Sequence, residues 1–138
     1  MWRLVHDLQP VEARLAKILP NNSPSCKYDC PDPTADRAHC YLACRLTSEV
    51  GQWLLSLIHR FDPTTTPVKL LRLEFEAGES SEGLVWIAVN TLMYSWMRRV
   101  AGKPARLTDC LASLTAEAQL LSDTRHRGTA LVVLNLLN

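Results

Sequence analysis

The sequence predicts an all-α fold, arranged as a small helical bundle, and three observations support this prediction. Apolar residues recur at helical spacing along most of the chain, no period-two strand pattern is longer than a few residues, and no internal repeat is present. Proline- and glycine-containing linkers separate the apolar segments. Because 138 residues suffice for one core but not for two, we predict a single domain over residues 1–138.

The N-terminal half of the chain carries signals for two helices. The first covers residues 10–19, where Pro10 suits the first helical position and apolar residues follow at helical spacing. A polar stretch with two prolines then stops it. The second helix begins at Thr47, or with Ser48 as its cap, and presents one apolar stripe as far as Phe61.

The C-terminal half is predicted to contain four helices. Thr66 as cap and Pro67 as first residue start a short one. Residues 84–100 are apolar around nearly the whole circumference, which is typical of a helix in the centre of a bundle. Thr108 is expected to cap the next helix, with Cys110 on or near its apolar face, and Thr129 to cap the last one.

Four cysteines and one histidine lie close together between the first two predicted helices. Zinc prefers a closed tetrahedral set of thiolate and imidazole ligands, often one pair on a tight knuckle and a second pair after a loop. The best-fitting set is Cys26, Cys30, His39 and Cys44. We therefore predict a structural Zn²⁺ site of the CCHC type, because four protein ligands leave no open position for catalysis. The chain divides into an N-terminal helix with the zinc-binding segment, residues 1–45, and a helical bundle, residues 46–138.

The spacing of the second ligand pair leaves one ligand open. His39 and Cys44 are five residues apart, about 500° on an unbroken helix, so they would lie on different sides, whereas Cys40 and Cys44 would share a face. Either the helix starts or breaks near His39, or Cys40 replaces it. Disulfides are disfavoured by the odd number of five cysteines and the lack of a secretory signal. Buried apolar thiols are disfavoured by the polar, proline-broken surroundings.

Composition and motifs exclude several classes of function. The formal net charge is +1, so any nucleic-acid surface must be a local patch. No signal peptide or membrane span is recognisable, and we expect an intracellular protein of the nucleus or cytoplasm with no membrane partner. Glycine-rich phosphate loops, metalloprotease motifs and nucleophile elbows are missing from the sequence. We predict neither enzymatic activity nor a small-molecule substrate.

Basic and aromatic residues gather around the cysteines and in two clusters at predicted helix C-termini. Cations at a helix C-terminus also interact favourably with the helix dipole, so a structural role is an alternative to phosphate contact. Aromatic rings beside such cations can stack on bases. The candidate nucleic-acid contacts are Lys27, Tyr28, Arg37, Tyr41, Arg45, Arg98, Arg99, Lys103, Arg125 and Arg127.

The chain resembles the C-terminal region of the reverse transcriptases of LINE-type (non-LTR) retrotransposons, where a zinc-binding segment follows the polymerase. The four metal-ligand candidates carry this resemblance, as a knuckle, a loop, and then His and Cys with four residues between them. It continues through Gly51-Gln-Trp-Leu-Leu-Ser and Trp96-Met-Arg-Arg-Val-Ala-Gly-Lys. The resemblance implies a Zn²⁺-containing domain that helps a reverse transcriptase hold template RNA or target DNA.

The chain also departs from this family. Three residues separate Cys26 from Cys30 where two are commoner, and fingers, palm and endonuclease are missing from the sequence, so polymerase activity is not carried over. The leading expectation is a non-catalytic nucleic-acid-binding domain whose partners are RNA or DNA and the rest of a reverse transcriptase. Two alternatives belong to other classes, a protein–protein interaction module derived from a retroelement and a redox-responsive thiol protein.

Overall fold

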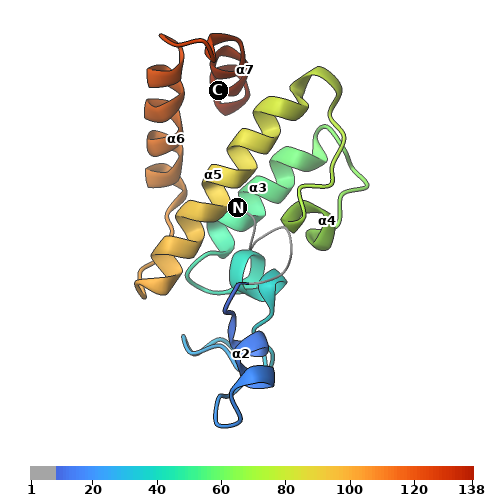
Figure 1. Ribbon diagram of the computed structural model, residues 1–138, viewed down its shortest axis with the longest axis vertical. Helices are drawn as coiled ribbons and strands as arrows, with labels where there is room; N and C mark the ends of the chain where they lie inside the picture. Colours follow the sequence, from blue (N-terminus) through green and yellow to red (C-terminus); the bar gives the residue numbers. More distant parts are fainter. Residues whose placement is uncertain (1–8) are drawn as a thin grey trace.

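The computed structural model describes residues 9–138, in which helices and turns account for all regular structure and no strand is present. The all-α prediction is therefore confirmed. Two parts lie along the long axis of the molecule (Figure 1). The larger part, the bundle, contains α3 (Ser48–His59), α4 (Pro67–Leu71), α5 (Ser81–Val100), α6 (Leu107–Leu121) and α7 (Arg127–Leu137). The smaller part is the N-terminal segment, residues 9–46, with α2 (Glu12–Ile18) and the π-helix η1 (His39–Ala43).

The core of the bundle is centred on α5, which packs against α3, α6 and α7. Leu54 and Ile58 of α3 and Ile87 and Leu92 of α5 are almost completely buried. Removing an aliphatic side chain of this size from water contributes about 1.5–3 kcal/mol. The apolar stripes predicted for these two helices thus form the core of the bundle.

Helix α5 lies at the centre of the bundle, as predicted for residues 84–100, but it is not buried on all sides. Met93, Met97 and Val100 are 52%, 68% and 58% exposed, because the neighbouring elements cover only part of the circumference of α5. The buried face instead includes Thr91 and Ser95. One apolar face of α5 is therefore left at the surface.

Helix α5 ends where the sequence predicted. Gly102 adopts a left-handed conformation with φ of 70°, and its N–H donates to the carbonyl of Arg99 at 2.9 Å. The N–H of Lys103 donates to the carbonyl of Arg98, also at 2.9 Å. These two bonds are the Schellman pattern, which satisfies helix carbonyls that would otherwise lack donors.

Local start signals were correct for α4, within one residue for α3, and wrong for three other helices. Helix α3 starts at Ser48, and Thr66 accepts the N–H of Lys69 at 3.3 Å to cap α4. By contrast, α2 starts at Glu12, so Pro10 precedes it instead of being its first residue. Similarly, α6 starts at Leu107 and α7 at Arg127, so Thr108 and Thr129 lie inside these helices instead of capping them. The Oγ1 atom of Thr129 instead donates to Glu82 at 3.0 Å.

The N-terminal segment is attached to the bundle by a close backbone approach between η1 and α3. A methyl group added at Gly51 would lie 1.9 Å from the carbonyl oxygen of Tyr41, a distance that no side chain accommodates. A second contact joins the N–H of Ala105 to the carbonyl of Leu46 at 2.7 Å. None of the helices within residues 9–138 is long and apolar enough to cross a membrane.

Candidate metal centre

Four side chains of the N-terminal segment bring their ligand atoms together. They are Cys26, Cys30, His39 and Cys44, and their ligand atoms all lie within 4.8 Å of one another. The Sγ atom of Cys44 lies 3.9 Å from Sγ of Cys26 and 3.9 Å from Sγ of Cys30. A tetrahedral ion with metal–sulfur bonds of about 2.3 Å would hold its sulfur ligands about 3.8 Å apart. The cluster is thus compatible with a metal site of the Cys₃His type.

The π-helix η1 resolves which residue completes the cluster. The N–H of Cys44 donates to the carbonyl of His39 at 2.7 Å, which closes a turn over five residues instead of four. This wider turn brings residues five apart to the same side. The Sγ atom of Cys40 lies elsewhere, 3.6 Å from Oε2 of Glu12. Of the two alternatives, the structure therefore brings His39 to the three cysteines.

His39 is positioned as a metal ligand would be. Its Nδ1 atom lies 3.1 Å from Oδ2 of Asp32, and its backbone N–H donates to Oδ1 of Asp36 at 2.8 Å. The Nε2 atom is buried and has no hydrogen-bond partner among residues 9–138. An unpaired buried nitrogen is destabilising, whereas a metal ion there would satisfy it, with Asp32 orienting the ring. The site thus fits a metal by an observation independent of the sulfur distances.

The knuckle between Cys26 and Cys30 is held by its own hydrogen bonds. Asp29 has a φ of 61°, a left-handed conformation that aspartate tolerates better than most residues. Nε of Arg45 donates to the carbonyl of Tyr28 at 2.5 Å. The backbone N–H of Arg45 donates a hydrogen bond to Sγ of Cys30 at 3.3 Å. These contacts shape a turn with three residues between its cysteines.

Arg99 of α5 joins the metal centre to the bundle. Its Nη2 atom donates to both carboxylate oxygens of Glu12, at 3.0 and 3.1 Å, and lies 3.4 Å from Sγ of Cys26. The hydroxyl of Tyr28 donates to the backbone carbonyl of Arg99. Arg99 is 3% exposed and Glu12 8% exposed, so this is a buried ion pair whose charges depend on each other.

The thiols differ in acidity. Burial tends to raise the pKa of Cys26, but hydrogen bonds to its sulfur, the largest of them from the Tyr28 N–H, outweigh it, and the pKa falls to about 6. Burial raises the pKa of Cys30 to about 11. Because metal ligation requires the thiolate, binding at neutral pH would release a proton from Cys30.

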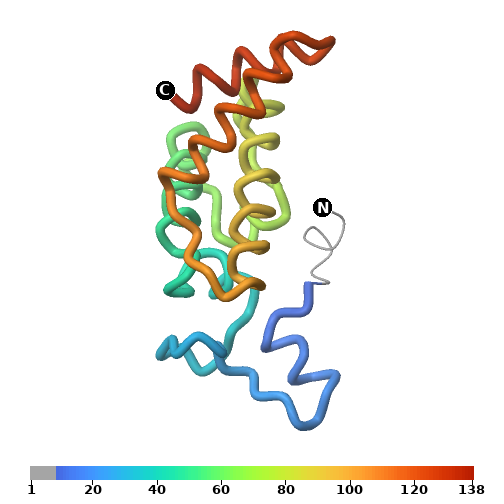
Figure 2. The backbone as a smooth tube through the Cα atoms, turned by 90° about the vertical axis from the view of Figure 1, so that its left-hand side faces the viewer, coloured from blue at the N-terminus to red at the C-terminus, as the bar shows by residue number. Residues whose placement is uncertain are grey.

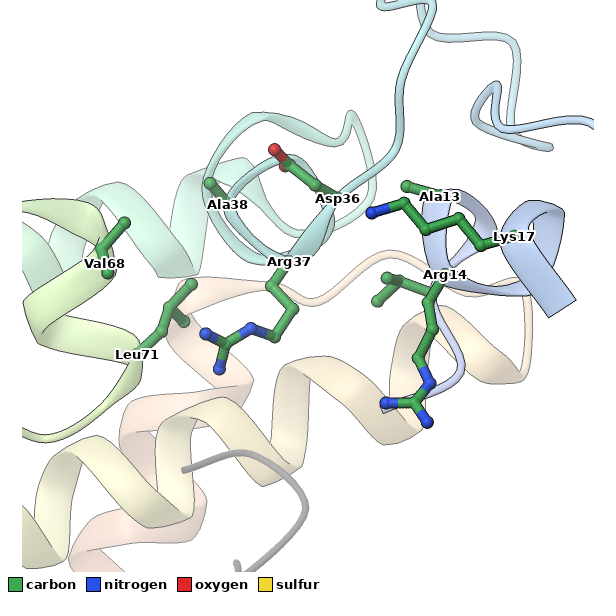
Figure 3. A pocket seen from close by; sticks show the side chains of 9 residues that line it. Ala13, Arg14, Lys17, Asp36, Arg37, Ala38, Val68 and Leu71 are labelled. Atoms are coloured by element: carbon green, nitrogen blue, oxygen red, sulfur yellow. The ribbon is translucent and has the colours of Figure 1, made fainter. Parts of the chain in front are cut away.

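Two of the predicted nucleic-acid contacts, Tyr41 and Arg99, are corrected by their burial, and a third, Arg37, is nearly buried. Tyr41 is 1% exposed and donates its hydroxyl to Oε1 of Gln9 at 2.7 Å, so its ring is not available to a base. Arg99 is committed to the buried ion pair described above. Arg37 is 8% exposed and lines a basic cleft of about 390 Å³ with Arg14 and Lys17 of α2 (Figure 3). The sequence showed the charge of these residues but not their surroundings.

Other predicted contacts are gathered near the metal centre. Lys27, Arg45 and Lys103 are exposed, and Arg98 is partly buried with its Nε donating to the carbonyl of Pro104 at 3.1 Å. Tyr28 is partly buried, with Nζ of Lys27 lying 5.3 Å and Cζ of Arg99 5.0 Å from its ring centre.

The remaining two predicted contacts, Arg125 and Arg127, lie elsewhere. Both are exposed at the turn between α6 and α7, at the end of the molecule opposite the N-terminal segment (Figure 2). The two basic clusters recognised in the sequence therefore do not form one surface.

Sequence reasoning missed the residues that support the cluster. Asp32 contacts the ligand candidate His39, and Glu12 contacts Cys40, but neither residue stands at a spacing that would have indicated this. Trp96 stacks at a tilt on Tyr41 with ring centres 6.1 Å apart, a contact that the helical spacing of the sequence does not indicate.

Comparison with protein-family models, curated proteins and solved structures found no match.

Proposed function

We propose that the chain is a non-catalytic nucleic-acid-binding domain whose N-terminal segment is stabilised by Zn²⁺. The convergence of Cys26, Cys30, His39 and Cys44 carries this proposal. Three sulfurs and one imidazole are the donors that zinc prefers, and four protein ligands make a closed, structural site. Zn²⁺ with three thiolates and a neutral imidazole bears one net negative charge, and the Arg99 guanidinium, which is shared with Glu12, lies next to it.

The basic residues beside the metal centre support the nucleic-acid part of the proposal. The knuckle contacts the C-terminal end of α5 through Tyr28, and Leu46 bonds to Ala105. These contacts bring two basic stretches of the chain next to each other. We define the phosphate-binding surface as the exposed or partly exposed cations Lys27, Arg45, Arg98, Lys103 and Arg106. Such a local patch is consistent with a net charge of only +1.

The likeness to LINE-type reverse transcriptases supplies the cellular role in this proposal. A domain of this kind would act beside a polymerase and hold template RNA or target DNA while another part of the protein performs synthesis. The rest of a reverse transcriptase is accordingly the proposed protein partner.

The experiment is a titration of labelled short single-stranded RNA, single-stranded DNA and duplex DNA with zinc-loaded protein at several salt concentrations. Affinity should fall with added salt, with a slope of about 0.7 per phosphate contact on a single strand. The variant Lys103→Glu/Arg106→Glu should bind more weakly. The matched control Arg125→Glu/Arg127→Glu changes charge equally at the other end of the bundle. A larger effect of the control variant would refute the surface, and absence of salt-dependent binding would refute the function.

The exposed apolar face of α5 favours a second candidate function, a protein–protein interaction module derived from a retroelement. Met93 and Met97 are more than half exposed and line a groove of about 260 Å³ between α5 and α6. Flexible methionine side chains are common on protein-binding surfaces. Binding of a partner there should be insensitive to salt and should be lost on Met97→Asp, which a nucleic-acid surface would not predict.

A further inference from the structure

A cleft of about 540 Å³ lies directly beside the metal centre, between α2, residues 22–27 and the C-terminal end of α5. Its volume is within the range of about 300–1,000 Å³ that is typical of small-molecule sites. Leu15, Trp96 and Val100 provide apolar walls. Asn22, Ser23 and Lys27 provide polar groups at the same cleft.

Trp96 gives the cleft an aromatic wall with a fixed position. The side chain is partly buried and packs on the fully buried ring of Tyr41, with 33° between the ring planes. An aromatic ring that is held in place and also lines a cleft can stack on a planar group at little cost in side-chain entropy. Of the aromatic residues near the metal centre, Trp96 therefore has the geometry that the sequence had assigned to Tyr28 or Tyr41.

The polar groups suit the edge and the backbone of a nucleotide. Asn22 is exposed and carries both a donor and an acceptor on its amide, which is what the hydrogen-bonding edge of a base requires. Lys27 is exposed and belongs to the phosphate-binding surface defined above. A strand whose phosphates follow that surface would thus pass the mouth of the cleft.

We propose that this cleft receives one unstacked nucleobase of a single-stranded RNA or DNA, with Trp96 stacking on the base. This inference rests on the proposed nucleic-acid function and adds a preference for single strands, because bases stacked within a duplex cannot enter. Cys26 and Arg99 also line the cleft, so its shape depends on the metal centre. Zinc would therefore organise base recognition without contacting the nucleic acid.

The test compares a short single strand with an abasic strand of the same length, which keeps the phosphates but has no bases. Val100→Trp places a large side chain at a cleft-lining position that is 58% exposed, so the fold should tolerate it. Met97→Trp is the matched control, since Met97 is 68% exposed on the same helix but lines the other groove. Trp96→Leu and Asn22→Ala probe the stacking wall and the polar edge directly.

Val100→Trp should weaken binding of the normal strand about tenfold, towards the affinity of the abasic strand, while Met97→Trp leaves it unchanged. Trp96→Leu should have a similar effect, with zinc content retained. Equal affinity of both strands for the wild type, with salt-dependent binding preserved, would overturn the cleft but leave the phosphate-binding surface intact. If the wild type binds neither strand, the proposed function fails and the cleft fails with it.

Discussion

The N-terminal segment and the bundle differ in the kind and number of their buried side chains. The bundle core consists mainly of large aliphatic side chains such as Leu54, Ile58 and Ile87. The buried cluster of the N-terminal segment is small, and its members are Val11, Cys26, Ala35, Cys40, Cys44 and Leu46. Segments of fewer than about 40 residues rarely fold on hydrophobic burial alone and usually need a disulfide or a metal. The comparison teaches that the bundle can be stable by packing, whereas residues 9–46 depend on specific polar contacts.

The buried glutamate, arginine and histidine side chains follow the same division. Glu12, Arg37 and His39 are buried in the N-terminal segment, and Arg99 reaches it from the end of α5. Buried charges stabilise a fold only when they are paired and hydrogen-bonded, so removing one partner is strongly destabilising. The two regions should therefore respond to different perturbations.

The largest expected effect is loss of the metal. Chelation, or Cys44→Ser, should abolish protection of residues 9–46 from hydrogen exchange while α3, α5, α6 and α7 stay protected. Cys40→Ala is the control, since this cysteine is buried but its Sγ contacts Glu12 instead of the metal-ligand candidates. Native protection of residues 9–46 in chelated protein would contradict the dependence on metal.

Arg99→Met tests the ion pair at the junction of the two regions. The change leaves the Glu12 carboxylate buried without its partner, which should lower the free energy of unfolding by about 3–5 kcal/mol in urea titrations. The control Arg98→Met removes a neighbouring charge that is partly exposed and should change stability far less. The double variant Glu12→Leu/Arg99→Met should recover part of the loss. Equal stability of Arg99→Met and Arg98→Met would show that the ion pair does not stabilise the fold.

Ile87→Ala tests the bundle alone. Its side chain is fully buried on α5, and the resulting cavity should lower the free energy of unfolding by about 2–5 kcal/mol. Zinc content and the rate of zinc release to a chelator should stay at the wild-type values, because Ile87 belongs to the bundle core and not to the N-terminal cluster. Faster zinc release would mean that a cavity in the bundle core reaches the metal centre through the packing of η1 on α3 and α5.

Thr66→Ala should have the smallest effect on the free energy of unfolding, because it removes a single local hydrogen bond. It removes the side-chain acceptor for the N–H of Lys69 at the start of α4, at a cost of about 1 kcal/mol. Thermal unfolding should show a small decrease in midpoint with no change in metal binding, and Thr66→Ser should behave as wild type. A loss of metal from Thr66→Ala would show that the effect of this cap is not confined to the start of α4.

The sequence predicted what depends on neighbouring residues. The start of α4 at Thr66 and Pro67 and the end of α5 at Gly102 follow from local backbone chemistry, and the structure contains both. The four metal-ligand candidates were also recognisable, because knuckle spacing is a local property. For Thr108 and Thr129, side-chain chemistry alone did not decide the helix start, since helix ends also depend on the packing of neighbouring elements.

Properties that depend on residues far apart in the chain followed from the fold. The choice of His39 over Cys40 required the wide turn of η1, and the withdrawal of Arg99 from the surface required Glu12, which is 87 positions away in the chain. The exposure of Met97 likewise depends on which helices reach α5. The helices and the ligand candidates could thus be predicted from the sequence, because hydrogen bonding and spacing act over a few residues. The fold determined which side chains meet, because burial is set by contacts between segments far apart in the chain.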